Sequence, residues 1–195
     1  MMSRDNSKTR IRILKASLTL LEASQGKGVR MTDIAKLAGI TRQALYLHFP
    51  SRAELLIATT LYLDEVKGVE QRLEPSRAAG SGTDRLDAYI EAWGNYIPEI
   101  YGIAKALLAM GDTDKAAAEA WGDRMQAMRH GCEAAINALN RDNVLSADFT
   151  PEQATDILWT MLSVRNWEQL TIECKWSQAR YIERLKLLAR HIFVG

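Results

Sequence analysis

The stretch that decides the fold is VRMTDIAKLAGITRQALYLHFPSRAE, residues 29–54, because it combines several helix start and stop signals in a short span. Thr32 is a good N-cap for a first short helix, and Gly39 suits the left-handed backbone that often ends a helix. Thr41 can then cap a second helix over residues 42–49. Two short helices joined at a glycine-containing turn predict a helix-turn-helix, whose second helix enters the DNA major groove.

The residues after this motif predict a third helix. Pro50 disfavours helical geometry at the residue before it, so the second helix should end there. Ser51 and Glu54 have the spacing of a capping box, which starts a new helix. The pattern of short helix, glycine and short helix also occurs in ordinary all-α domains, so the turn alone does not establish DNA binding.

The distribution of charge favours a nucleic-acid partner for the N-terminal part. The whole chain of 195 residues has a formal net charge of only +1. Residues 1–52, however, carry ten Lys or Arg against three Asp or Glu, a net charge of +7, and the remainder carries −6. Basic side chains that neutralise phosphates release counterions, which drives binding to DNA. A solvated basic face without a partner is the alternative, but the charge coincides with the predicted helix-turn-helix, so DNA binding is the leading hypothesis.

Other features of the sequence bound the class of protein. Only Cys132 and Cys174 occur, far apart and without a CxxC spacing, which indicates neither a disulfide framework nor a zinc site. No apolar run resembles a signal peptide or reaches the length of a membrane span. We therefore expect a cytoplasmic protein with no membrane partner, no metal site and no cofactor.

The remainder of the chain is predicted to be helical, which makes the fold class all-α with about nine helices. Apolar residues recur every three or four positions, and a stretch of small residues at 75–82 and Pro98 separate the helices. The last two predicted helices are apolar on broad faces, so one side should pack on the core and a partner subunit could cover the other. The predicted helices outside the opening segment cover residues 7–24, 52–73, 84–96, 98–110, 114–140, 151–174 and 177–193.

The N-terminal motifs resemble the DNA-binding domain of the tetracycline-repressor (TetR) family of bacterial transcription regulators. The matching segments are TDIA, AGIT and LYLHFPSR, at residues 32–35, 38–41 and 45–52. Residues 162–170 are also similar to the penultimate helix in one group of these regulators. The family often has Lys at the position of Arg52, a change that keeps the phosphate-binding charge.

The resemblance implies a homodimer that binds a palindromic double-stranded DNA operator. It implies a helix-turn-helix DNA-binding domain at residues 1–52 and a helical effector-binding and dimerisation domain at 53–195. In such a protein the fifth to seventh helices enclose a small-molecule effector, and the eighth and ninth form the dimer interface. Repression is the usual outcome in the family, and activation is the alternative.

Roles for individual residues at the DNA follow as hypotheses. Arg suits guanine O6 and N7 and Gln suits adenine N6 and N7, so Arg42 and Gln43 are predicted to contact bases. Other residues are better placed to contact phosphates and set the register, although Tyr46 and His48 could equally pack the domain. These predicted phosphate contacts are Thr32, Thr41, Tyr46, His48 and Arg52, with Lys8, Arg10 or Arg12 of the first helix also near phosphates.

The C-terminal part contains many aromatic and sulfur side chains. Core packing is the usual explanation for such residues at helical spacing. Met and Trp nevertheless suit an adaptable apolar cavity, so a pocket for an apolar or aromatic effector is the functional hypothesis. The candidate ligand-binding residues are Trp93, Tyr96, Tyr101, Met110, Trp121, Met125, Met128, Trp159 and Trp167.

The sequence also bears on two other classes of protein. An enzyme is disfavoured because His130 and Cys132 lie on different faces of one helix and His191 has no evident acid or nucleophile beside it, so no catalytic residue is predicted. A helical protein–protein interaction module without a small-molecule ligand is the second rival. Such a module would not need the excess of basic residues at the N-terminus.

Overall fold

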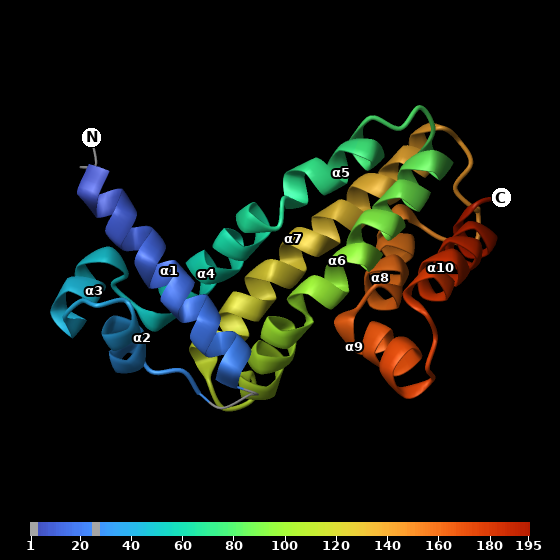
Figure 1. Cartoon of the computed structure of the whole chain (residues 1–195). Helices are drawn as coiled ribbons and strands as arrows, with labels where there is room; N and C mark the ends of the chain where they lie inside the picture. Colours follow the sequence, from blue (N-terminus) through green and yellow to red (C-terminus); the bar gives the residue numbers. More distant parts are fainter. Residues whose placement is uncertain (1–3, 25–27) are drawn as a thin grey trace. The chain divides into compact units, whose positions relative to one another are not determined.

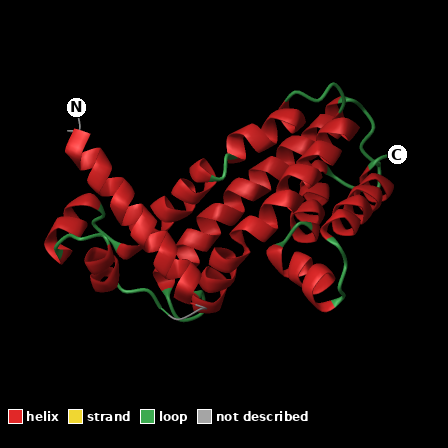
Figure 2. Ribbon diagram, viewed as in Figure 1, coloured by secondary structure: helices red, strands yellow, loops and turns green. Residues whose placement is uncertain are grey.

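The computed structural model describes residues 4–24 and 28–195, and these residues form helices joined by loops with no strand among them (Figure 2). The all-α fold class is therefore confirmed for the described chain. In chain order the elements are α1 (Arg4–Ser24), α2 (Met31–Leu37), α3 (Arg42–His48), α4 (Arg52–Val66), α5 (Val69–Arg77), α6 (Gly82–Met110), α7 (Lys115–Arg141), α8 (Pro151–Met161), α9 (Val164–Trp167), a π-helix η1 (Glu168–Glu173) and α10 (Gln178–Phe193) (Figure 1).

The chain divides into two compact units that each draw on α6 and α7. Unit 1 comprises the described residues up to Lys67 together with Ile100–Met125. Unit 2 comprises Gly68–Glu99 and Gln126–Gly195. The predicted functional division into residues 1–52 and 53–195 stays a prediction.

Unit 1 has a core built mainly from its first four helices. The helix α1 packs against α2 and α4, and α2 packs against α3 (Figure 1). The hydroxyl of Thr59 on α4 lies 2.9 Å from that of Ser17 on α1, and both residues are fully buried. The largest buried apolar side chains here are Ile13, Leu21, Ile34, Leu45, Phe49, Leu55 and Leu56.

The local signals around the helix-turn-helix are confirmed, apart from the start of α2. Gly39 has a left-handed backbone with φ of 66°, and the hydroxyl of Thr41 accepts a 3.1 Å hydrogen bond from the N–H of Ala44. Ser51 caps α4 in the same way. The prediction that Thr32 caps α2 is wrong, because the helix begins at Met31 and Arg30 occupies the N-cap position without a side-chain hydrogen bond.

Two predicted helix boundaries near the middle of the chain are also wrong. The predicted helix 52–73 stops at Val66, because Gly68 takes a left-handed backbone (φ 65°) and a new helix, α5, follows it. The predicted break at Pro98 does not occur, and α6 continues through it. Pro98 is exposed, and α6 is held by buried residues on both sides of the proline, so packing outweighs the missing hydrogen bond.

The predicted helix 151–174 is interrupted as well. Its start is confirmed, because Thr150 and Gln153 form a complete capping box at the first turn of α8. After Met161, however, Ser163 caps a new helix, and the chain continues as α9 and the π-helix before α10. The hydroxyl of Ser163 accepts from the N–H of Asn166 (3.2 Å), a local bond that competes with continuation of α8.

Unit 2 contains a tight contact between α6 and α7. A Cβ atom at Gly131 would lie 2.3 Å from the hydroxyl of Tyr89, so the ring can occupy this place only because residue 131 is glycine. The Tyr89 hydroxyl donates to the backbone carbonyl of Met128 (2.8 Å).

None of the helices, within the part of the chain that is described, has both the length and the apolar character that crossing a membrane requires.

Candidate nucleic-acid interface

The helix α3 presents three different faces. Leu45 lies on the inner side of α3, and Phe49 directly follows the helix. Both are at most 1% exposed and pack in the core of unit 1. With 3.6 residues per turn, Gln43 and Leu47 project roughly 160° away from Leu45. Both are exposed, and Leu47 keeps 84% of its surface accessible. The outermost face of α3 is therefore free to meet a partner.

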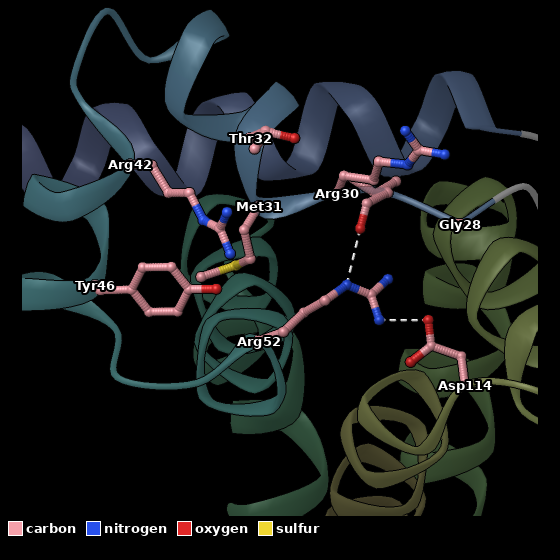
Figure 3. A pocket seen from close by; sticks show the side chains of 9 residues that line it. Gly28, Arg30, Met31, Thr32, Arg42, Tyr46, Arg52 and Asp114 are labelled. Carbon is pink, nitrogen blue, oxygen red and sulfur yellow. Dashed lines mark hydrogen bonds and ion pairs between the residues drawn. The ribbon is translucent and has the colours of Figure 1, made fainter.

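Arg42 and Tyr46 form the flank of α3 that lies beside an open pocket. The guanidinium of Arg42 lies over the Tyr46 ring, 5.5 Å from its centroid. The pocket has a volume of about 560 Å³ and is shown in Figure 3. Its lining residues come from the loop before α2 and the start of that helix, from α3, from the first residue of α4 and from the residue before α7: Gly28, Val29, Arg30, Met31, Thr32, Arg42, Tyr46, Arg52 and Asp114.

Arg52 is held in this pocket by two contacts. Its Nε donates to the backbone carbonyl of Val29 (2.8 Å), and its Nη1 forms an ion pair with the carboxylate of Asp114 (Figure 3). The remaining nitrogen, Nη2, is buried and has no hydrogen-bond partner among the described residues. Arg30, Arg42 and Arg52 thus face the pocket with Asp114 as its acidic lining residue, which leaves the pocket basic and suited to phosphate.

Asp114 also caps the start of α7. Its Oδ1 accepts from the N–H groups of Ala116 (3.1 Å) and Ala117 (3.3 Å). Partial burial on its own would raise the pKa of Asp114. The Arg52 guanidinium and these two N–H groups lower it by more than burial raises it, so the pKa lies below its usual 3.8. The carboxylate therefore stays ionised and keeps its hold on Arg52.

Arg10 of α1 secures the far end of α3. Its Nη1 donates to the carbonyl of His48 (3.1 Å), and its guanidinium lies 4.1 Å from the centroid of the Phe49 ring. Arg10 was predicted, with Lys8 and Arg12, as a basic residue near phosphates. In the structure these two contacts help to fix the direction of α3, and the predicted phosphate contact of Arg10 stays a prediction. The sequence did not predict this contact, because Arg10 and His48 are 38 residues apart and no local pattern connects them.

The structure brings four of the seven predicted DNA-binding residues together. Thr32, Arg42, Tyr46 and Arg52 line the basic pocket. The other three, Thr41, Gln43 and His48, are not among its lining residues, and the Thr41 hydroxyl already accepts from Ala44. Sequence reasoning missed Asp114, because it lies 62 residues from Arg52 in the chain.

A second cavity lies inside unit 1, among α4, α6 and α7. It has a volume of about 10 Å³, room for about one water molecule. At its wall Asp64 and Arg124 form a nearly buried ion pair (3.2 Å), which connects α4 to α7. The other lining residues are mostly apolar: Thr60, Leu63, Ile100, Ile103, Ala104, Leu107 and Trp121.

The nine predicted ligand-binding residues do not gather around this cavity. Trp121 is the one that lines it. Tyr101, Met110, Trp121 and Met125 belong to unit 1, and Trp93, Tyr96, Met128, Trp159 and Trp167 belong to unit 2.

Two of the tryptophans have hydrogen bonds within unit 2. The indole N–H of Trp93 donates to the carbonyl of Leu162 (2.8 Å), and that of Trp167 donates to the side chain of Gln178 (2.9 Å). Buried indoles with such partners are usual in a packed core. The ligand-binding role of the nine residues stays a prediction.

Among the described residues, no group of three or more His, Cys, Asp or Glu side chains is placed to hold a metal ion.

The segment that supplies all the lining residues of the pocket except Asp114 matches a known family. The model of the family described as "Bacterial regulatory proteins, tetR family" matches residues 13–59. This range contains α2, α3, most of α1 and the first half of α4. The match therefore covers the helix-turn-helix and the helices that brace it.

Individual relatives extend the likeness beyond this segment. The HTH-type transcriptional regulator CymR of Pseudomonas putida is 27% identical over 176 residues, which are 87% of this chain and 81% of CymR. The nucleoid occlusion factor SlmA of a Marinomonas species (strain MWYL1) is 34% identical over 64 residues, only 33% of this chain and 32% of SlmA. NalD, the secondary repressor of the MexAB-OprM multidrug efflux pump in Pseudomonas aeruginosa, shares the fold, with a TM-score of 0.68 and 20% identity over 98% of both chains.

Proposed function

This chain belongs to the TetR family of bacterial transcription regulators, and we propose that it is a repressor which a small apolar or aromatic effector releases from a palindromic operator. Membership of the family makes it a DNA-binding regulator and not an enzyme. The observation that carries the proposal is the basic pocket beside the exposed face of α3. The repressor role is supported by NalD, which has the same fold and is described as a repressor.

The phosphate contacts come from the rim of the pocket. Thr32, Arg42, Tyr46 and Arg52 surround an open space with a surplus of positive charge, as a DNA backbone beside α3 requires. Thr41 and His48, at the two ends of α3, remain candidates for further phosphate contacts. Arg52 is held in a fixed position beside this space, since its Nε and Nη1 are bound within unit 1, and Asp114 offsets part of its charge.

Base reading falls to the outermost face of α3. Gln43 projects away from the core and can pair with adenine N6 and N7 in the major groove. Arg42 was predicted to read a guanine. Its position over Tyr46, at the wall of the basic pocket, favours a phosphate contact instead.

Dimerisation would use the C-terminal helices of unit 2. Tyr181, Leu185 and Phe193 fill the inner side of α10, whereas Leu187 and Leu188 on its other side remain about half exposed. A second copy of the chain would cover these apolar residues and generate the two-fold symmetry of a palindromic operator. The two copies of α3 would then lie about 34 Å apart, one turn of DNA.

The effector would act through α4. The cavity among α4, α6 and α7 is too small for an organic molecule as it stands, so binding requires its walls to move apart. Its wall includes Asp64, which lies on the same helix as Arg52. An effector that prefers the expanded cavity would shift the population of α4 positions and with it the spacing of the two recognition helices.

The test begins with selection of bound sequences from a random DNA pool by the full-length protein. We expect a palindromic site whose binding weakens steeply as salt is raised. Sedimentation should show a dimer at the concentrations used, and a compound screen should find apolar or aromatic molecules that release the DNA. A helical interaction module would enrich no sequence, and an activator would bind the site but raise transcription from it.

A further inference from the structure

Leu47 is an apolar side chain on α3 that the basic pocket does not use. At 84% exposure it is the most exposed of the large hydrophobic residues in the described chain. Exposed leucines are common on protein surfaces, so exposure alone decides nothing. This one, however, lies on a short helix whose inward position, Leu45, is already fully buried. Leu47 therefore does not contribute to the core of unit 1.

The neighbours of Leu47 define what it can meet. Gln43 lies one turn earlier on the same outward face, because residues four apart in a helix are neighbours. Arg42 and Tyr46 occupy the adjacent flank, beside the basic pocket. The outermost ridge of α3 thus consists of one amide and one branched alkyl group, with cationic side chains to its side.

We propose that Leu47 packs against the C5-methyl group of a thymine in each operator half-site. The inference rests on the proposed function, because it needs α3 to enter the major groove. Thymine is the base that presents an apolar methyl group there, whereas guanine, adenine and cytosine present hydrogen-bonding atoms. Leu47 can neither donate nor accept, so the thymine methyl group, which projects beside the O4 acceptor of that base, is the group in the major groove that it can pack against. Together with Gln43, it would read a thymine close to an adenine.

One chemical change isolates this contact. Replacing a thymine by deoxyuridine removes the C5-methyl group and leaves base pairing unchanged. Each thymine of the selected half-site is replaced in turn, and the affinity of the full-length protein is measured by fluorescence anisotropy. At one position we expect a loss of about fourfold per half-site, the effect of removing one buried methyl group.

Two variants assign the loss to Leu47. Leu47→Ala should bind the thymine and deoxyuridine operators equally well at that position. Leu61→Ala, which removes another exposed leucine (55% exposed) from α4, should keep the fourfold difference. Since Leu47 is almost fully exposed, Leu47→Ala should unfold at the wild-type temperature, which shows that the fold is intact.

The possible outcomes separate the inference from the function beneath it. Equal binding of every deoxyuridine operator by the wild-type protein, or a fourfold difference retained in Leu47→Ala, overturns the role of Leu47. So does a selected site without thymine in its half-sites, although the protein would then still be a sequence-specific regulator. Failure to enrich any sequence overturns the proposed function and the inference with it.

Discussion

Arg52 at the start of α4 is ion-paired with Asp114 at the start of α7. The same two helices are joined a second time, further along both, by Asp64 and Arg124. The two pairs have opposite polarity, so the basic partner lies on α4 in one and on α7 in the other. From the first pair to the second, the chain runs from N- to C-terminus along both α4 and α7. A shift of α7 against α4 therefore has to disturb a residue of the basic pocket.

Replacing Asp114 by Asn should strengthen DNA binding. The change removes the negative charge beside Arg52 while Arg52 keeps its hydrogen bond to Val29. Repulsion between the Asp114 carboxylate and a DNA phosphate about 6 Å away in water costs about 0.7 kcal/mol. Without it we expect the affinity to rise about threefold at low salt. Asp112→Asn is the control, since Asp112 lies in the same turn but does not line the pocket. Unchanged or weaker binding by Asp114→Asn alone would contradict a competition between Asp114 and DNA.

The Arg52–Asp114 pair should also make stability depend on pH. The folded protein holds the pKa of Asp114 below its usual 3.8, so the carboxylate contributes stability above that value and loses the contribution as the pH falls through its folded pKa. At pH 7 we expect Asp114→Asn to be less stable than the wild type by up to about 1 kcal/mol, the upper end of the range for ion pairs near the surface. Urea unfolding at pH 7 and at successively lower pH should show this difference shrinking in acid. A difference that grows in acid would refute the assignment.

Arg42→Ala and Gln43→Ala should weaken DNA binding in different ways. If Arg42 contacts a phosphate, its loss lowers affinity for all sequences and reduces the slope of log affinity against log salt by about 1. If Gln43 reads adenine, its loss relaxes one base position by about 1–3 kcal/mol and leaves the salt slope nearly unchanged. Competition between operator and single-base variants at several salt concentrations measures both effects. Selective loss at one base position in Arg42→Ala would restore it as a base reader.

Two glycines of α7 should respond oppositely to alanine. At Gly131 a Cβ would meet the buried ring of Tyr89, so Gly131→Ala should lower the free energy of unfolding by about 1–3 kcal/mol. At Gly122 nothing lies within 4 Å of the added atom, so Gly122→Ala should raise it by about 0.5–1 kcal/mol through higher helix propensity. Urea unfolding of the two variants provides the comparison. Equal effects would mean that the ring of Tyr89 moves aside easily.

The helix-turn-helix was predictable because its signals act over three or four residues. Gly39 takes a left-handed backbone, and the hydroxyls of Thr41 and Ser51 bind the N–H groups three residues ahead. Such contacts depend on a few neighbouring residues only, so most of the information they need is in the local sequence, although the cap expected at Thr32 did not form. The charge excess of residues 1–52 is likewise a property of composition, and the family match over residues 13–59 covers the same segment.

The arrangement of the side chains around that motif came from contacts that local sequence does not encode. Arg52 reaches Asp114 across 62 residues and Arg10 reaches His48 across 38, and both meetings depend on how whole helices pack. The same packing carries α6 through Pro98, against the local preference of proline. The sequence by itself therefore determined where the helix-turn-helix lies and which helix is proposed to meet DNA, because caps and turns are short-range. Only the tertiary structure decided that Arg42 faces the basic pocket and that Gln43 and Leu47 face outward, because burial of Leu45 and Phe49 sets the rotation of α3.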